Sequence, residues 1–158
     1  MPVLVRAITY ATLFVGFALV FLPSRVLSAM EVVGPPRLGP RQVAGVIVGT
    51  AGMAVASWCV VSFALIGRGT PAPFDPPRRL VIHGPYRHTR NPMYLGAGLA
   101  LVGAALFYEN GFLFAYAGGF LLLMHLVVVL YEEPTLRATF GQDYVKYSEH
   151  VHRWWLSP

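Results

Sequence analysis

Residues 91–131 read NPMYLGAGLALVGAALFYENGFLFAYAGGFLLLMHLVVVLY, and Glu109 is the single charged residue among them. A helix needs roughly 20 apolar residues to cross a bilayer core about 30 Å thick. The stretch therefore predicts two membrane spans, Asn91–Tyr108 and Asn110–Tyr131. Only Glu109 and Asn110 interrupt the apolar sequence between them, so a tight antiparallel hairpin is predicted.

Two earlier stretches, Ala7–Ser24 and Val43–Ile66, are also long and free of charge. Across the chain, 56% of residues are hydrophobic and 12% are charged, whereas soluble domains carry about 25% charged residues. These features predict an all-α integral membrane protein with four spans in one domain, residues 1–158. Four spans leave no room for a separate soluble catalytic domain, so any active site must be built from the helices and their loops.

The first stretch has an alternative interpretation as a cleaved signal peptide. Its uncharged core is long, and Arg25 stands where a cleavage site is expected. Both features favour a retained membrane helix.

Basic residues predict the orientation. With four spans, the N-terminus, the loop before the third span and the C-terminal tail share one side, which holds nine of the twelve Lys and Arg residues. Cytoplasmic segments carry the excess of these residues, so both termini and the active site are predicted to be cytoplasmic. The basic residues lie in the gaps between apolar runs, so the net charge of +5 does not indicate a nucleic-acid partner. A lone cysteine, Cys59, excludes a multi-cysteine metal site, and no metal is predicted.

Small residues indicate where the helices touch. Gly45 and Gly49 form a GxxxG pair in the second span, and Gly96, Ala100 and Ala104 form a similar stripe in the third. Such residues let helix backbones approach closely in a membrane. Close packing of these two spans is therefore predicted.

The loop Gly67–Pro92 holds six of the thirteen prolines and five arginines in 26 residues. Proline removes a backbone donor and fixes φ, so a stiff connection rather than a long helix is predicted. A basic loop of this kind suits an anionic or nucleotide-like ligand, or it is a solvated connector held by anionic lipid. Composition leaves both interpretations open.

The end of this loop contains groups that suit a charged ligand. Asn91 and Pro92 are typical of a helix N-cap and first helical position. The free N–H groups of the first turn, with Arg90 beside them, predict an anion site. Tyr86 and Tyr94 offer aromatic faces for a sulfonium or an adenine.

The end of the fourth span is the second candidate region. His125 and Glu132 are seven residues apart, which places them on one face of a regular α-helix. A His in an apolar span indicates a site residue or an interhelical hydrogen bond. Glu132 and Glu133 stand beside a predicted kink at Pro134. The tail beyond them has aromatic residues at helical spacing, which predict two short amphipathic helices.

The two regions together resemble the isoprenylcysteine carboxyl methyltransferase and phospholipid methyltransferase superfamily. The usual pattern is a basic residue, His or Asn, Pro, any residue, Tyr, any residue and Gly, followed later by Glu-Glu. Here the first motif is RNPMYLG, Arg90 to Gly96, and the second is Glu132-Glu133 with the tail FGQDYVKY. The resemblance covers residues 67–154.

The resemblance implies an integral membrane methyltransferase that uses S-adenosylmethionine and a lipophilic acceptor. The cofactor is expected among the third and fourth spans, the loop before them and the tail, without a Rossmann domain. The predicted catalytic residues are His125 (the available base), Glu132 and Arg90. The predicted cofactor-binding residues are Leu80, Val81, His83, Gly84, Tyr86, Asn91, Pro92, Met93, Tyr94, Gly96, Gly98, Glu132 and Glu133.

One departure from the family pattern concerns the acceptor. The prenylcysteine enzymes carry an arginine for the substrate carboxylate one turn before the glutamate, and this chain has Val128 there. This departure favours a thiol, an amine or a phenol-type oxygen as the methyl acceptor over a free prenylcysteine carboxylate.

Two other functions are compatible with the pattern. An NADPH-dependent, sterol-reductase-like membrane oxidoreductase shares a similar motif and a membrane hairpin, although Asn91 and the Glu132-Glu133 pair favour the methyltransferase. A non-catalytic membrane scaffold would keep the fold and bind neither cofactor.

Overall fold

The computed structural model describes residues 3–32, 34, 37–67 and 78–157, and every regular element in these ranges is a helix. The all-α prediction is confirmed for this part of the chain. The predicted stiff loop falls partly on residues 68–77, which lie outside the described residues. Residues 78–91 contain one 3-10 turn, η3 (Gly84–Arg87).

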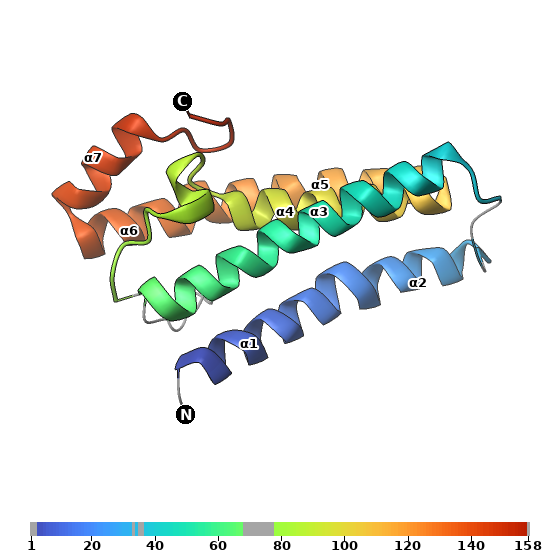
Figure 1. Cartoon of the computed structure of the whole chain (residues 1–158), viewed down its shortest axis with the longest axis horizontal. Helices are drawn as coiled ribbons and strands as arrows, with labels where there is room; N and C mark the ends of the chain where they lie inside the picture. Colours follow the sequence, from blue (N-terminus) through green and yellow to red (C-terminus); the bar gives the residue numbers. More distant parts are fainter. Residues whose placement is uncertain (1–2, 33, 35–36, 68–77, 158) are drawn as a thin grey trace.

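Three long helices form the body of the molecule (Figure 1), and each of them contains a π-helical turn. Their segments, in chain order, are α1 (Val3–Phe14), η1 (Val15–Phe21) and α2 (Leu22–Ala29); α3 (Pro40–Ser62) and η2 (Phe63–Gly67); and α5 (Gly111–Val127), η4 (Val128–Glu132) and α6 (Glu133–Phe140). All three are long and apolar enough to cross a bilayer, so the chain is an integral membrane protein.

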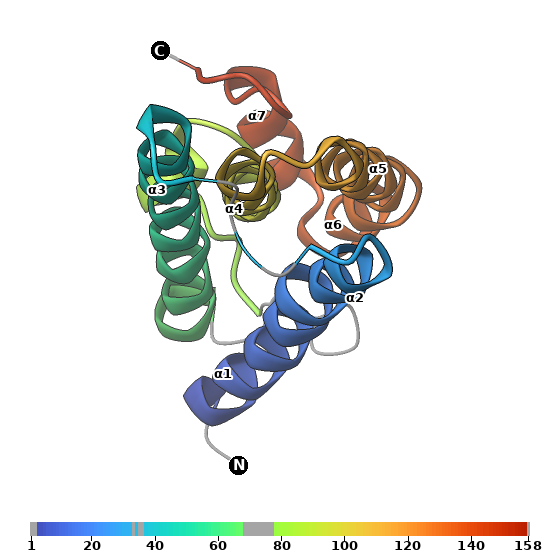
Figure 2. The same ribbon diagram turned by 90° about the vertical axis from the view of Figure 1, so that its right-hand side faces the viewer.

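A fourth apolar helix, α4 (Pro92–Tyr108), is shorter than the other three. At about 1.5 Å per residue, its 17 residues extend about 25 Å, less than a bilayer core of about 30 Å. The prediction of four full spans is therefore confirmed for three helices only. Seen along the bundle, α4 lies at the centre, between α3 and α5 (Figure 2).

Two of the π turns are closely followed by a proline. Pro23 and Pro134 each lie two residues after the end of a π turn, η1 and η4 respectively. Proline has no N–H, and its ring collides with the carbonyl four residues earlier. The wider i→i+5 turn accommodates the proline without ending the helix. The last long helix therefore continues to Phe140 and does not stop at Tyr131, the predicted end of the span.

The connection between α4 and α5 consists of Glu109 and Asn110. Glu109 adopts a left-handed conformation, with φ 48° and ψ 40°. The Asn110 side chain caps α5 by accepting hydrogen bonds from the amides of Phe112 (2.9 Å) and Leu113 (3.2 Å). Gln42 of α3 donates to Glu109 Oε1 at 3.0 Å, which ties the turn to the neighbouring helix. The turn brings α4 and α5 into contact along the bundle.

Glycines allow α3 and α4 to pack with their backbones in contact. A Cβ added at Gly52 would lie 2.5 Å from the carbonyl oxygen of Gly96, and one at Gly103 would lie 2.5 Å from the Cα of Gly49. A Cβ at Gly45 would lie 2.7 Å from the carbonyl oxygen of Gly103. The predicted close packing of these spans is confirmed, and Gly52 and Gly103 extend the contact beyond the predicted stripe.

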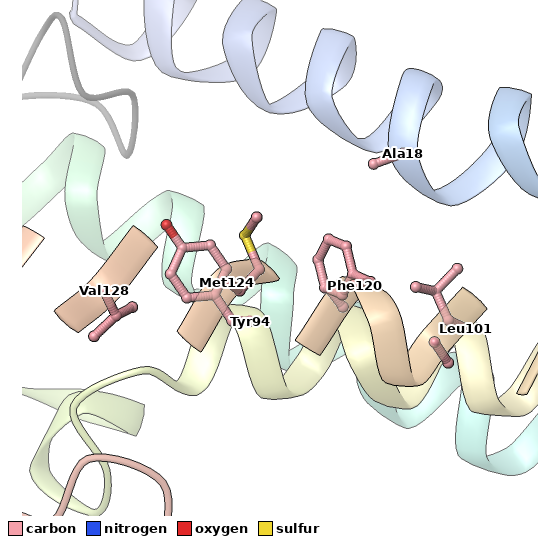
Figure 3. Packing of buried hydrophobic residues seen from close by; sticks show 8 residues of the cluster. Ala18, Tyr94, Leu101, Phe120, Met124 and Val128 are labelled. Atoms are coloured by element: carbon pink, nitrogen blue, oxygen red, sulfur yellow. The ribbon is translucent and has the colours of Figure 1, made fainter. Parts of the chain in front are cut away.

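A second contact surface joins the first helix to α4 and α5. Tyr116 of α5 donates from its hydroxyl to the Ala18 carbonyl at 2.8 Å. Aromatic and aliphatic side chains pack on this side of the bundle, and Figure 3 shows Tyr94, Met124 and Phe120 in a row on the side of the helix that carries Ala18. The buried members of this core are Ala18, Tyr94, Ala97, Leu101, Ala117, Phe120, Met124 and Val128.

Candidate functional site

The candidate site lies at the start of α4. Asn91 occupies the N-cap position and Pro92 opens the helix, as predicted. The Asn91 side chain makes no cap hydrogen bond, and its Nδ2 donates to the carbonyl of Arg153 at 3.1 Å. Thr89 donates to the same carbonyl at 3.1 Å. The polar groups before α4 therefore bind the C-terminal segment instead of closing their own helix.

Tyr94 and Glu132 bring the two predicted motifs into contact. Tyr94 stands in the first turn of α4, is 8% exposed, and donates from its hydroxyl to Glu132 Oε1. Glu132 is the last residue of η4 and is half-buried. Among the described residues, no Lys or Arg forms an ion pair with Glu132. Glu132 is therefore a half-buried carboxyl group that accepts a hydrogen bond from one phenol and has no ion-pair partner among the described residues.

Glu133 has different neighbours, although it is next in the sequence. Its side chain is 9% exposed and accepts two hydrogen bonds from Arg153, from Nε at 2.7 Å and from Nη2 at 2.9 Å. Arg90 Nη1 lies 3.1 Å from Glu133 Oε1 and 3.4 Å from the Tyr144 hydroxyl. The hydrogen bonds to Glu133 raise the pKa of Arg153 above its ordinary value. One carboxylate faces two guanidinium groups, so this group of residues carries excess positive charge.

His125 contacts the tail. Trp154 Nε1 donates to His125 Nδ1 at 3.0 Å. Because an indole N–H is only a donor, Nδ1 must carry the lone pair, and a neutral ring then has its proton on Nε2. A general base needs the lone pair that this contact engages.

The prediction that His125 and Glu132 share a helix face assumed a regular α-helix between them, and the structure has a π turn there. The π turn η4 lies between them, so their seven-residue spacing no longer corresponds to two α-helical turns. His125 contacts Trp154, whereas Glu132 contacts Tyr94. The structure brings Glu132 and Tyr94 together and assigns His125 a partner in the tail.

Tyr86 and Val81 are buried against α3, at 6% and 5% exposure. The Tyr86 ring packs edge-on against Phe63, with ring centroids 5.4 Å apart. Its backbone carbonyl accepts a hydrogen bond from the Tyr147 hydroxyl at 2.6 Å. Protein therefore covers the aromatic face that Tyr86 was predicted to offer to a ligand.

Four further predicted cofactor residues lie at the same end of the bundle. Leu80 and Met93 are half-buried, and His83 is exposed. Gly84 has a positive φ of 61°, and a Cβ there would lie 3.3 Å from Trp58 Nε1. Gly84 therefore lets the turn η3 approach the Trp58 indole.

Gly96 and Gly98 are buried between helices. A Cβ at Gly96 would lie 2.7 Å from the Gly52 carbonyl oxygen, and one at Gly98 would lie 2.7 Å from the Leu121 side chain. Backbone packing is sufficient to require a small residue at Gly96, whereas the neighbour of Gly98 is the end of the flexible Leu121 side chain. Their contact with a cofactor stays a prediction.

Arg153 and Trp154 were missed as site residues. In the sequence, Arg153 reads as one of several cytoplasmic charges, and Trp154 as an interfacial aromatic. Their partners, Glu133 and His125, lie 20 and 29 residues earlier in the chain. The unusual pair of carboxylates was the one available signal that a basic partner was needed nearby.

Residues 41–143 match the phospholipid methyltransferase family. The match covers well over half of the chain and includes both the Arg90–Gly96 motif and the Glu132-Glu133 pair. The chain belongs to the phospholipid methyltransferase family. Membership implies a membrane methyltransferase. No curated protein and no solved structure matches the chain. The family match ends before Tyr144, so the last residues of the site lie outside it.

Proposed function

We propose that this membrane methyltransferase takes its methyl group from S-adenosylmethionine and transfers it to a lipophilic acceptor. The observation that carries the proposal is the Tyr94–Glu132 contact, in which a half-buried carboxylate has no cationic partner among the described residues. The sulfonium of the cofactor is a cation. A carboxylate attracts it more strongly where little water is present.

The neighbouring residues fit the other end of the same cofactor. S-adenosylmethionine also carries a carboxylate, and the group formed by Arg90, Arg153 and Glu133 has excess positive charge. Within the described residues, Arg90 Nε is buried and has no hydrogen-bond partner. The site thus offers negative charge at Glu132 and positive charge at Arg90, in keeping with a zwitterionic ligand.

The chemistry requires positioning more than acid–base catalysis. When bound, the sulfonium supplies the methyl group: an acceptor lone pair bonds to the methyl carbon, the carbon–sulfur bond breaks, and sulfur keeps that electron pair as a neutral thioether. Orientation of two reactants can supply about 7–11 kcal/mol. Glu132 favours the cationic ground state, since the positive charge leaves the sulfur during transfer. We therefore expect Glu132 to govern cofactor affinity more than turnover.

The acceptor is proposed to enter from the bilayer, near the cytoplasmic ends of α4 and the last long helix. Val128 is 1% exposed and packs in the apolar core, at the position where the related prenylcysteine enzymes carry an arginine. A buried valine cannot pair with a substrate carboxylate. A thiol, an amine or a phenol-type oxygen on an apolar tail is the proposed acceptor, and its proton passes to water or to a base.

Calorimetry with the purified protein in detergent tests the cofactor assignment. We expect S-adenosylmethionine to bind, and Glu132→Gln to weaken binding by about 1.5–3 kcal/mol, because the amide keeps the shape and loses the charge. Glu149→Gln, on the exposed surface of α7 (Gln142–His150), is the matched control and should leave the affinity unchanged. Equal affinities for wild type and Glu132→Gln would remove Glu132 from the site.

The same titrations separate the alternative functions. Binding of NADPH in place of S-adenosylmethionine would favour a reductase, and binding of neither would favour a scaffold. A panel containing a farnesylcysteine analogue, a long-chain thiol and an aminophospholipid, each with labelled S-adenosylmethionine, then tests the acceptor. Turnover of the farnesylcysteine analogue alone would overturn the inference from Val128.

A further inference from the structure

The segment Val151–Ser157, which we name the clasp, is hydrogen-bonded to the residues before α4 through His152, Arg153 and Ser157. The Arg90 amide donates to the carbonyl of His152 at 2.9 Å, and the Ser157 amide donates to the carbonyl of His88 at 2.6 Å. Between these two bonds, the side chains of Thr89 and Asn91 donate to the Arg153 carbonyl. Four consecutive residues before α4 therefore bind the clasp.

Arg153 of the clasp connects two elements at once. Its carbonyl accepts the bonds from the residues before α4, while its guanidinium forms the two-pronged contact with Glu133 of α6. Tyr94 lies three residues after Asn91, and Glu132 directly precedes Glu133. Tyr94 and Glu132, the two halves of the proposed site, therefore each lie within three residues of a side chain that is hydrogen-bonded to Arg153.

We propose that Arg153 is a positioning residue, which sets the geometry of the Tyr94–Glu132 pair by holding the start of α4 against the start of α6. The link to cofactor affinity rests on the proposed function. A planar guanidinium is suited to this role because it matches a carboxylate with two parallel hydrogen bonds, whereas a lysine ammonium is a single point charge.

A purely structural role for Arg153 predicts a different result. Loss of the Arg153–Glu133 contact would then lower thermal stability, and the molecules that remain folded would keep the wild-type Tyr94–Glu132 geometry and cofactor affinity. A positioning role predicts that both properties change in folded protein. Measurements on the folded fraction therefore separate the two roles.

The test uses full-length protein in detergent with 3-fluorotyrosine incorporated at position 94. The ¹⁹F resonance of Glu132→Gln defines the signal of the altered contact. We expect Arg153→Gln to move the resonance towards that signal and to weaken S-adenosylmethionine binding about fivefold or more, the usual lower bound for coupling between separate groups. Arg153→Lys should fall between Arg153→Gln and wild type.

Lys146→Gln is the control, because Lys146 is an exposed cation on α7. It should change neither the resonance nor the affinity. If Arg153→Gln does not fold, Arg153→Lys and Thr89→Val carry the same test. The proposal is overturned if the folded variants melt at lower temperature but keep the wild-type resonance and affinity.

The two readouts distinguish failure of this proposal from failure of the proposed function. The ¹⁹F resonance needs no cofactor, so a shift without S-adenosylmethionine binding in any form would leave the positioning role intact and reject the cofactor. If Glu132→Gln weakens binding but Arg153→Gln does not, the cofactor assignment stands and the positioning role is rejected.

Discussion

Glu132 and Glu133 are adjacent in the chain but face different groups in the fold. Glu133 accepts hydrogen bonds from Arg153, forms an ion pair with Arg90, and is almost completely buried. Glu132 accepts a hydrogen bond from Tyr94 and forms no ion pair with a Lys or Arg among the described residues. At the scale of single residues, one carboxylate serves the structure, and its neighbour is the candidate for binding a cation.

Tyr94→Phe tests the phenol donor without disturbing the core. The ring stays in the hydrophobic cluster, so thermal stability should change little. We expect S-adenosylmethionine affinity to fall by about 0.5–1.5 kcal/mol, since one hydrogen bond to Glu132 is lost and the carboxylate remains. Tyr131→Phe, an exposed tyrosine nearby, is the control. Equal calorimetric affinities for Tyr94→Phe and wild type would show that the hydroxyl does not support the site.

His125→Ala separates a base from a structural acceptor. Because the lone pair of Nδ1 is engaged by Trp154, we expect the variant to lose stability and to keep the shape of the pH–rate profile. The measurement is turnover of an active acceptor from the panel as a function of pH. Activity that collapses near neutral pH and recovers at high pH would instead assign the base role to His125.

At the scale of elements, α4 owes its central place to contact with α3. Glycines on both helices bring backbone against backbone, so α4 is enclosed by protein and does not need the length of a full membrane span. The residues directly before its first turn are hydrogen-bonded to the clasp. The π turn before Pro134 continues the last long helix and presents Glu132 to this turn.

Gly103→Ala should destabilise the protein by about 1–3 kcal/mol, because the new methyl group meets backbone atoms that cannot move aside. Gly118→Ala is the matched control on α5, since no atom lies within 4 Å of a Cβ there. Thermal unfolding in detergent is the measurement, and Gly103→Ala should melt well below Gly118→Ala. Equal melting temperatures would contradict the backbone contact.

At the scale of the whole molecule, the structure gathers its chemistry at one end of the bundle. The start of α4, the end of the last long helix, α7 and the clasp all meet there, and the α4–α5 turn lies at the other end (Figure 1). A polar cofactor and a membrane-dissolved acceptor have to meet where water and bilayer meet. This arrangement is consistent with a methyltransferase that is embedded in the membrane.

Cysteine accessibility tests the proposed orientation, with both termini and the site in the cytoplasm. Single cysteines replace Glu109, in the α4–α5 turn, and Glu149, near the end of α7. We expect the two positions to react with an impermeant maleimide from opposite sides of the membrane. The native Cys59 is fully buried, so its background should be low. Labelling of both positions from the same side would show that the topology is wrong.

The sequence by itself determined the membrane class, the helical fold, the close packing near Gly45 and Gly96, and the family motif. These properties depend on local information, since the length of an apolar run, the spacing of glycines and a short motif are all read within one or two segments. The prediction that the two motifs meet was also within reach, because the resemblance implied it.

Only the tertiary structure decided which partner each polar group has. Glu133 pairs with Arg153, His125 accepts from Trp154, and Asn91 binds the clasp instead of capping α4. These partners depend on how the tail folds back over α4, and on a π turn that changes the direction of the side chains after His125. Helical spacing predicts neither feature. The course of the tail arises from contacts between segments that are distant in the chain, and the π turn, which accommodates Pro134, breaks the regular 3.6-residue period.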